Sequence, residues 1–293
     1  MRFQFVEENR SAFPVKKMCQ VLKLSMSGYY RWREAPLSSR QMAKERLKRR
    51  IRELFVSHKG MAGSPILTAD LHDEPAFSKV SRPRVARLMR EMGLKCQTVK
   101  KFVVTTDSKH NEPLAPNLLD RKFNTSSPDQ VWVSDITYLK VGSKWYYLTV
   151  FLDLFSRIVV GWDLSSSLER HSAIRALNKS ILRRRPEQGL MVHSDRGVQY
   201  ASADFRNVLQ SQGFVQSMSR KGNCWDNAVA ESFFHSIKTQ LIHHQRFQNA
   251  TEAEQAIFKY IEVYYNRQRK HSTNGYKSPA HYEQEWWNNR KAA

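Results

Sequence analysis

Residues 131–139 read VWVSDITYL, an apolar run with one acid, Asp135, at its centre. β-branched and aromatic residues are typical of strands, and a run that is apolar on both faces predicts a buried, central strand. A carboxylate inside such a strand costs free energy unless a cation pairs with it. Asp135 is therefore an edge residue that meets water, an acid that makes a local hydrogen bond, or an acid with a function.

Strands and helices are expected to follow this run in a fixed order. After a hairpin-like turn at 142–144, we predict strands over 145–153 and 157–163. Helices and strands then alternate: a helix over 168–185, a strand over 190–193, a helix over 202–212, a strand over 214–218 and a long helix over 226–243. This order predicts the α/β class, with a mixed sheet flanked by helices.

The C-terminal tail is predicted to be helical. Thr251 and Glu254 resemble a capping box at the start of an aromatic helix that reaches Asn266. A final short helix is expected to begin at Ser278-Pro279.

Two further acids occupy positions where chemistry is common. Asp195 follows the short buried strand, and ligands of open α/β sheets gather beyond the carboxyl ends of strands. The alternative is a turn-forming Asp before Gly197. Glu231 lies within the long helix, with His235 and Lys238 on or beside its face. The alternative there is a solvated helix face.

The combination of the three acids favours a metal site. Mg²⁺ and Mn²⁺ prefer carboxylate and water ligands, which Asp135, Asp195 and Glu231 would supply. Two such ions can activate a water or a 3′-hydroxyl and stabilise the leaving oxygen in phosphoryl transfer. Lys238 and His235 are then placed to hold a DNA backbone.

Charge is the strongest feature of the composition. The 293 residues contain 48 Lys and Arg against 27 Asp and Glu, a formal net charge of +21. A surplus of this size indicates a polyanionic partner, usually nucleic acid, although ribosomal-type and membrane-surface proteins share it. We find no run of 18 apolar residues and no signal-peptide core, so we expect no membrane and a cytoplasmic, nucleoid-associated location.

Three cysteines stand far apart in the sequence. Cys19, Cys96 and Cys224 have no spacing that is typical of a zinc site. We interpret all three as reduced, buried thiols.

The first third of the chain is basic and is predicted to be helical. Short helices over 14–23 and 29–33, separated by a Ser/Gly break at 25–28, suggest a helix-turn-helix. A long helix with one apolar stripe is expected over 38–58.

A third basic helix is expected to begin after Ser81, an N-cap, with Pro83 in its first turn. Its apolar face leaves Arg82, Arg84 and Arg87 toward solvent or phosphates. Residues 105–130 lose periodicity and are interpreted as a linker.

Several other groups have structural readings beside functional ones. We interpret Asp153 and Asp163 as strand-end residues, Asp226 as a helix N-cap and His193 as a packed histidine, with direct or indirect roles at the site as the alternative. Arg267, Arg269 and Lys270 form a basic cluster that is either a DNA contact or a solvated face.

These motifs together resemble a known family. The 35 residues between Asp195 and Glu231 match the D-D-35-E pattern of retroviral-integrase-like transposases. The strings WVSDITYL (132–139), FLDLFSRIVVGW (151–162), HSDRGVQY (193–200), SRKGNCWDNAVAESFFHSIK (219–238) and YYNRQRKHS…GYKSP (264–279) closely resemble the OrfB proteins of the insertion-sequence-three family. The front of the chain is similar to that family's helical DNA-binding region in residues 14–32 and 81–95.

The resemblance implies a ribonuclease-H-like catalytic core with Asp135, Asp195 and Glu231 as its metal-binding triad and Lys238 as the family's lysine. The domains expected are a helix-turn-helix-like segment (1–36), a helical DNA-binding domain (37–104), a linker (105–130), the catalytic core (131–246) and a C-terminal helical extension (247–293).

The resemblance also implies a reaction and partners. The chain is expected to be a DDE transposase that cuts double-stranded DNA at the element's ends and joins the 3′-hydroxyl to target DNA, using Mg²⁺ or Mn²⁺, two ions at a time. Two ends must be brought together, so we expect a homo-multimer on DNA. Whether the chain acts alone, with an upstream OrfA product or as part of a frameshifted OrfAB fusion stays open.

Two other functions remain as alternatives. One is a DNA-binding regulator without nuclease activity, because KGMAGSPILTADLH (59–72) lacks the Tyr-Gly pair usual in the family. The other is a general ribonuclease-H-type nuclease, which would cleave DNA without joining it.

Overall fold

The computed structural model describes residues 2–34, 38–96, 113–168, 170–221 and 223–292. The chain divides into two compact units, Met1–Leu54 and Phe55–Ala293. The sheet and all three candidate acids belong to the second unit. None of the helices in the described ranges is long and apolar enough to cross a membrane.

The first unit is built of short helices around a small apolar core. These are α1 (Arg2–Glu8), α2 (Val15–Val21), α3 (Met26–Glu34) and most of α4 (Ser39–Ser57). The sequence did not predict α1. It also placed a break at 25–28, where the structure has the first turn of α3, because the Ser25 hydroxyl accepts a hydrogen bond from Gly28 N at 3.2 Å and so caps the helix.

The second unit opens with helices that match the predicted basic region. These are the end of α4, α5 (Ser64–His72), the 3-10 helix η1 (Pro75–Phe77) and α6 (Arg82–Glu91). Ser81 precedes α6 as predicted, but its side chain makes no capping hydrogen bond. The 59–72 segment folds into α5 and buries Leu67 and Leu71, so the missing Tyr-Gly pair does not prevent a helix there.

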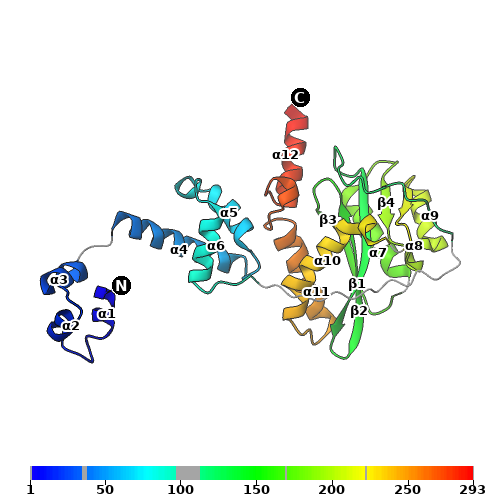
Figure 1. Cartoon of the computed structure of the whole chain (residues 1–293). Helices are drawn as coiled ribbons and strands as arrows, with labels where there is room; N and C mark the ends of the chain where they lie inside the picture. The colour runs from blue at the N-terminus through cyan, green and yellow to red at the C-terminus, as the bar shows by residue number, and fades with distance from the viewer. Residues whose placement is uncertain (1, 35–37, 97–112, 169, 222, 293) are drawn as a thin grey trace. The chain divides into compact units, whose positions relative to one another are not determined.

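A five-stranded sheet forms the centre of the second unit (Figure 1). Its order is β3-β2-β1-β4-β5, made of β1 (Val131–Val141), β2 (Lys144–Asp153), β3 (Val159–Ser165), β4 (Met191–Ser194) and β5 (Val215–Met218). The first three strands are antiparallel, and β4 and β5 run parallel to β1. The predicted mixed sheet is confirmed, and the VWVSDITYL run is its middle strand.

Helices cover both faces of this sheet (Figure 1). On one face, α7 (Arg170–Arg184), α8 (Val198–Ala201) and α9 (Ala203–Ser211) pack on Trp132 and Phe151. On the other, α10 (Ala228–Gln240), α11 (Ala250–Phe258) and the π-helix η4 (Lys259–Tyr265) pack on Val133 and Val150. Alternate residues of β1 thus point into two different cores, which is why the whole run is apolar.

Three expectations about the second half are corrected by the structure. The helix predicted over 226–243 is α10 between two 3-10 turns, η2 (Cys224–Asn227) and η3 (Ile242–His244). The capping box lies at Asn249 and Glu252, whose side chains accept from Glu252 N and Gln248 N, and not at Thr251 and Glu254. After the short η5 (Ser272–Asn274), the last helix, α12 (Pro279–Ala292), has 14 residues and is not short.

Gly161 marks the closest approach of a helix to the sheet. It lies in β3 opposite Phe151, beneath α7. A Cβ atom built there would lie 2.1 Å from Ser180 Oγ and 2.9 Å from the Ala176 carbonyl oxygen. Only glycine allows β3 and α7 to pack at this distance, because one contact is with helix backbone that cannot turn away.

We predict that Gly161→Ala destabilises the second unit by about 1–3 kcal/mol or more, the usual cost of overpacking. The free energy of unfolding in urea measures the effect. Gly63→Ala is the control, since its new Cβ would meet only Pro65 Cδ, at 3.6 Å. Equal stability of the two variants would contradict this account of the packing.

Candidate active site

The pairing of β1 with β4 brings two of the three acids near one another. The strands run parallel, with Val131 opposite Met191 and Val133 opposite His193. Asp135 lies two residues beyond Val133, and Asp195 directly follows β4, two residues beyond His193. Side chains alternate along a strand, so Asp135 shares the face on which Val133 packs against α10, and the charge of Asp195 acts on it there.

The third acid arrives on α10. This helix buries Ala230, Phe233 and Ile237 against the sheet, and Glu231 follows directly after the first of them, half-buried. The start of the helix is tied to the middle strand, because the Asn227 side-chain amide donates to the Ser134 carbonyl oxygen at 3.1 Å. Glu231 therefore lies one turn from an anchor beside Asp135.

Asp226 fixes the same helix start from the other side. Its carboxylate is fully buried and accepts from Arg121 Nε at 2.9 Å, from the Arg220 guanidinium at 2.8 and 2.9 Å and from Asn117 Nδ2 at 2.9 Å. The Arg220 hydrogen bond, outweighing burial, holds the pKa of Asp226 well below its usual range. The expectation that Asp226 is an N-cap is wrong, because its carboxylate joins three segments instead of capping the helix.

Backbone amides orient two of the candidate carboxylates. Asp135 Oδ1 accepts from Ile136 N at 2.8 Å, and Asp195 Oδ1 accepts from Gly197 N at 3.0 Å. A Cβ at residue 197 would lie 3.1 Å from Asp195 Oδ1, so glycine permits the turn that holds this carboxylate. Both side chains are thus positioned by their own loops and strands.

The three acids affect one another electrostatically. Burial raises the pKa of Asp135 well above its usual value, and the charges of Asp195 and Glu231 raise it further. Burial also raises the pKa of Glu231. The positive charge of Lys238 lowers the pKa of Asp135, and burial lowers the pKa of Lys238 itself. One lysine thus only partly compensates a cluster of acids, which favours a further cation.

Tyr200 and Ser134 lie behind this cluster and were not singled out in the sequence. Ser134 Oγ donates to the Val150 carbonyl oxygen at 2.9 Å and lies 2.8 Å from Tyr200 Oη. Burial raises the pKa of Tyr200 well above its usual value, and the charges of Asp135 and Asp195 add to this. The signal available in the sequence was a polar residue on the buried face of a central strand.

The donor set fits a hard divalent ion. Carboxylate oxygens are the ligands that Mg²⁺ and Mn²⁺ prefer, and these acids carry uncompensated negative charge. Within the described residues, no three His, Cys, Asp or Glu side chains meet closely enough to share one ion. Carboxylates that repel one another are expected to stay apart until a cation and its other ligands draw them together.

The predicted DNA contacts fall into three groups. Lys238 faces the site, its Nζ 5.4 Å from the centre of the Tyr138 ring, and His235 is exposed on the same helix. The three predicted basic contacts on α6 are all exposed: Arg82, Arg84 and Arg87.

The third group follows η4, and two of its three side chains already have contacts within the protein. Arg267 is exposed. Lys270 instead pairs with Asp70 at 3.2 Å and with Asp73 at 2.5 Å, and Arg269 packs on the Tyr265 ring and contacts His271 at 2.9 Å. A DNA role for Lys270 or Arg269 would have to compete with these contacts.

The remaining polar residues have structural partners. Asp153 accepts from Asp129 N at 2.7 Å and from Phe155 N at 2.9 Å, and burial raises its pKa to about 6. Asp163 pairs with Arg175 and Lys179, both at 2.8 Å. His193 is fully buried between Ser217 and Ser219, and burial lowers its pKa to about 4, which confirms a packed histidine.

The cysteine expectation holds for one of three residues. Cys19 is a buried thiol outside any disulfide, whereas the Cys96 thiol is only half-buried and donates to the Met61 carbonyl oxygen. The Cys224 side chain lies outside the described residues.

Known protein families match most of the chain. An "Integrase core domain" model matches residues 125–224, an "HTH-like domain" model 42–102, and a second "Integrase core domain" model 231–286. The "Insertion element IS600 uncharacterized 31 kDa protein" of Shigella sonnei is 40% identical over 92% of this chain and 98% of its own length. "Transposase InsF for insertion sequence IS3A" of Escherichia coli (strain K12) is 38% identical over 97% of this chain and 98% of its own.

Solved structures are more distant. The simian T-cell lymphotropic virus intasome with the PP2A regulatory subunit B56 gamma aligns at 17% identity and a TM-score of 0.47, over 80% of this chain and 74% of that one. The HTLV-2 integrase catalytic core domain with magnesium aligns at 19% identity and a TM-score of 0.42, over 54% and 98%.

We predict that Asp226→Asn lowers the free energy of unfolding at pH 7. The difference from the unchanged protein should shrink as the pH falls through about 4. The folded-state pKa is depressed, so the contribution of this carboxylate is present above its ordinary pKa and is lost as the pH falls. Urea unfolding from pH 7 to pH 3 measures it. Glu254→Gln, at an exposed position, is the matched control. A deficit that does not change with pH would show that charge is not what holds Asp226 in place.

Proposed function

The chain belongs to the insertion-sequence-three (IS3) family of transposases, and from that membership we propose its reaction and its catalytic residues. The reaction is cleavage of DNA at the ends of an insertion element and joining of the freed 3′-hydroxyl to target DNA. The observation that carries the proposal for the site is the convergence of Asp135, Asp195 and Glu231 from a central strand, a strand end and a helix on one face of the sheet.

We assign each acid a role in holding divalent ions. Asp135 in β1 and Asp195 just beyond the end of β4 would bind from the sheet, and Glu231 would close the site from α10. When bound, two Mg²⁺ or Mn²⁺ ions supply an activated oxygen nucleophile and charge stabilisation at the leaving oxygen. Lys238, beside Asp135, would pair with a DNA phosphate next to the reacting bond.

The helical front part is proposed to hold the DNA. Arg82, Arg84 and Arg87 extend from α6. We assign DNA binding to residues 1–36 and 37–104 and catalysis to residues 131–246. Residues 105–130 are then the linker, and residues 247–293 are the C-terminal extension. His235 and Arg267 add exposed basic groups near the core. We further propose action as a homo-multimer on two element ends, on the nucleoid of a bacterial cell, with an OrfA product or as an OrfAB fusion.

We predict that Asp135→Asn, Asp195→Asn and Glu231→Gln each abolish strand joining while DNA binding is retained. Mutating a residue that holds a metal ligand in place costs about 10–100-fold in activity, so mutating a residue that binds the metal directly should cost more. The assay uses Mg²⁺ and DNA with the ends of the parent element, with electrophoretic separation of joined products.

Glu254→Gln is again the control and should join DNA at the wild-type rate. Wild-type joining by any of the three variants would overturn the assignment of that residue. Cleavage without joining would favour a general nuclease, and binding with neither reaction would favour a DNA-binding regulator.

A second prediction concerns α6. Neutralising Arg82, Arg84 and Arg87 together to Ala should weaken DNA binding and flatten its salt dependence, by about 0.9 in the log–log slope for each phosphate that the arginines no longer neutralise. Fluorescence anisotropy between 50 and 200 mM salt, about the range over which such binding weakens strongly, gives the slope. The matched control removes the same charge outside the proposed DNA-binding domains, by changing the exposed Lys259, Arg290 and Lys291 to Ala. Equal slopes in both triple variants would remove α6 from the interface.

A further inference from the structure

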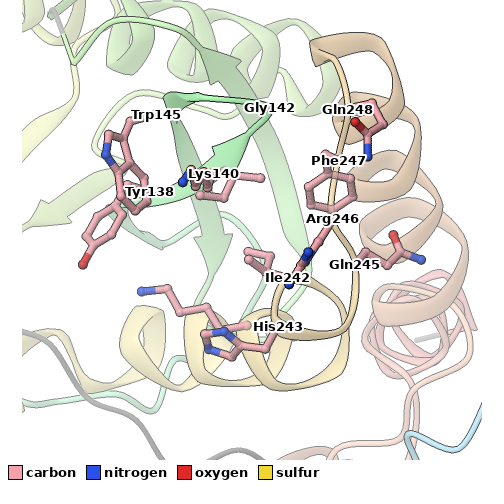
Figure 2. A pocket seen from close by; sticks show the side chains of 12 residues that line it. Tyr138, Lys140, Gly142, Trp145, Ile242, His243, Gln245, Arg246, Phe247 and Gln248 are labelled. Atoms are coloured by element: carbon pink, nitrogen blue, oxygen red, sulfur yellow. The ribbon is translucent and has the colours of Figure 1, made fainter.

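A cavity opens at the tip of the β1–β2 hairpin, beside the candidate active site. It has a volume of about 820 Å³ and lies between the hairpin and the segment that follows α10 (Figure 2). Small-molecule sites typically occupy about 300–1,000 Å³, so it has room for one nucleotide unit of a longer chain. Of its lining, the mechanism proposed above uses only Lys238.

The walls of this cavity are fixed by backbone contacts. Gly142 N donates to the Phe247 carbonyl oxygen at 2.8 Å, and Val141 forms a parallel bridge with Phe247, which is buried. Gly142 has a φ of +57°, and a Cβ there would lie 3.2 Å from the Gln248 carbonyl oxygen. The hairpin tip and the 241–248 segment are therefore joined without a ligand, and the cavity is preformed.

Aromatic and cationic side chains line the cavity together. Figure 2 shows Tyr138 and Trp145 side by side on the hairpin, with Arg246 and His243 on the opposite segment. The two rings meet edge to face, with centroids 5.0 Å apart, and Trp145 is 52% exposed. Its indole thus offers a surface on which a base could stack.

The charge of the lining is entirely positive. Lys140, Lys238 and Arg246 lie on it, and no Asp or Glu does. Across the described residues, Lys140 and Arg246 form no salt bridge, and both are exposed. Two cations without a carboxylate partner next to an exposed indole match a phosphate attached to a base better than they match an acidic peptide, which offers no ring to stack.

Lys238 connects the cavity with the candidate active site. It lines the cavity, and its charge acts on Asp135. Tyr138, beneath its ammonium group, lies three residues beyond Asp135 on the same strand. Three residues of a strand span about 10 Å. A DNA strand that places a phosphate at the acids would therefore reach this space within about three nucleotides at roughly 3.4 Å of rise per base in B-form DNA, and in fewer when unstacked.

We propose that this cavity binds one unstacked nucleotide of the DNA strand that flanks the reacting phosphate. The base stacks on Trp145, and its phosphate lies between Lys140 and Arg246. This inference rests on the proposed function and deepens it: it names the part of the substrate that the hairpin tip holds. The nucleotide belongs either to the element end or to the target DNA.

The first test uses 2-aminopurine, a fluorescent base that stacking quenches, placed in turn at each position flanking the joining site. The full chain carries Glu231→Gln so that DNA binds without reacting. We expect strong quenching at one position and its loss in Trp145→Ala. Placing the probe in the element end in one set of substrates and in the target in another identifies which DNA supplies the nucleotide.

The second test measures joining and affinity in an otherwise unchanged chain. Trp145→Ala should lower DNA affinity by about tenfold, the order expected when one base no longer stacks. Lys140→Ala with Arg246→Ala should reduce the log–log salt slope by about 0.7–0.9, the value for the one phosphate that the two side chains share. Matched controls are Phe258→Ala, which removes a ring that is also 52% exposed, and Lys259→Ala, at an exposed position outside the cavity lining.

An abasic site in the DNA makes the test independent of protein folding. Removing the quenched base should weaken wild-type binding as much as Trp145→Ala does, and the two changes together should cost little more than one. Losses of affinity that add up in the combined experiment would overturn the inference. It would also be overturned if the Trp145 and Lys140/Arg246 variants behaved like the controls while the wild-type chain joins DNA. If the wild-type chain binds DNA and quenches the probe at one position but joins no DNA, the proposed function alone would be contradicted.

Discussion

The parallel pairing of β1 with β4 is the interaction on which the site depends. Its register sets Val133 against His193, two residues before Asp135 and Asp195, and so brings the two acids to the same end of the pairing. A slip of one residue would turn every side chain of β4 to the opposite face and separate the acids. The apolar residues on both faces of β1 resist such a slip, because Trp132 and Val133 belong to two different cores.

Glu231 depends on a second constraint, the attachment of α10. Phe233 and Ile237 bury the helix against the sheet but fix only its general direction. Its start is located by polar bonds: Asn227 to the backbone of Ser134, and Asp226 to Arg121 and Arg220. Bonds of this kind have narrow geometry, whereas apolar packing tolerates shifts, so they are suited to placing a carboxylate.

These constraints explain what could be predicted from the sequence. The sheet follows from apolar runs such as VWVSDITYL, and the place of Asp195 just beyond a buried strand could also be read from the sequence. The register that brings Asp195 near Asp135 could not, because it joins strands about 60 residues apart in the chain. The role of Asp226 could not be read, because an acid before a helix looks the same whether it caps the helix or binds Arg121, 105 residues earlier in the chain. Long-range partners of polar residues leave no local pattern. The cavity beside Lys238 was invisible for the same reason, since its walls come from segments about 100 residues apart, which only the fold brings together.

Charge links the acids to the rest of the molecule. A chain with a net charge of +21 attracts DNA but repels free divalent cations, so acids that hold ions as proposed would do so against the field of the whole protein. Bound DNA would oppose that field, and its phosphates are themselves ligands that Mg²⁺ accepts beside carboxylates and water. Burial, followed by the charge of Asp195, raises the pKa of Asp135. In the proposed reaction, the electrostatic cost of placing these acids together would therefore be lowest when DNA and metal bind at the same time.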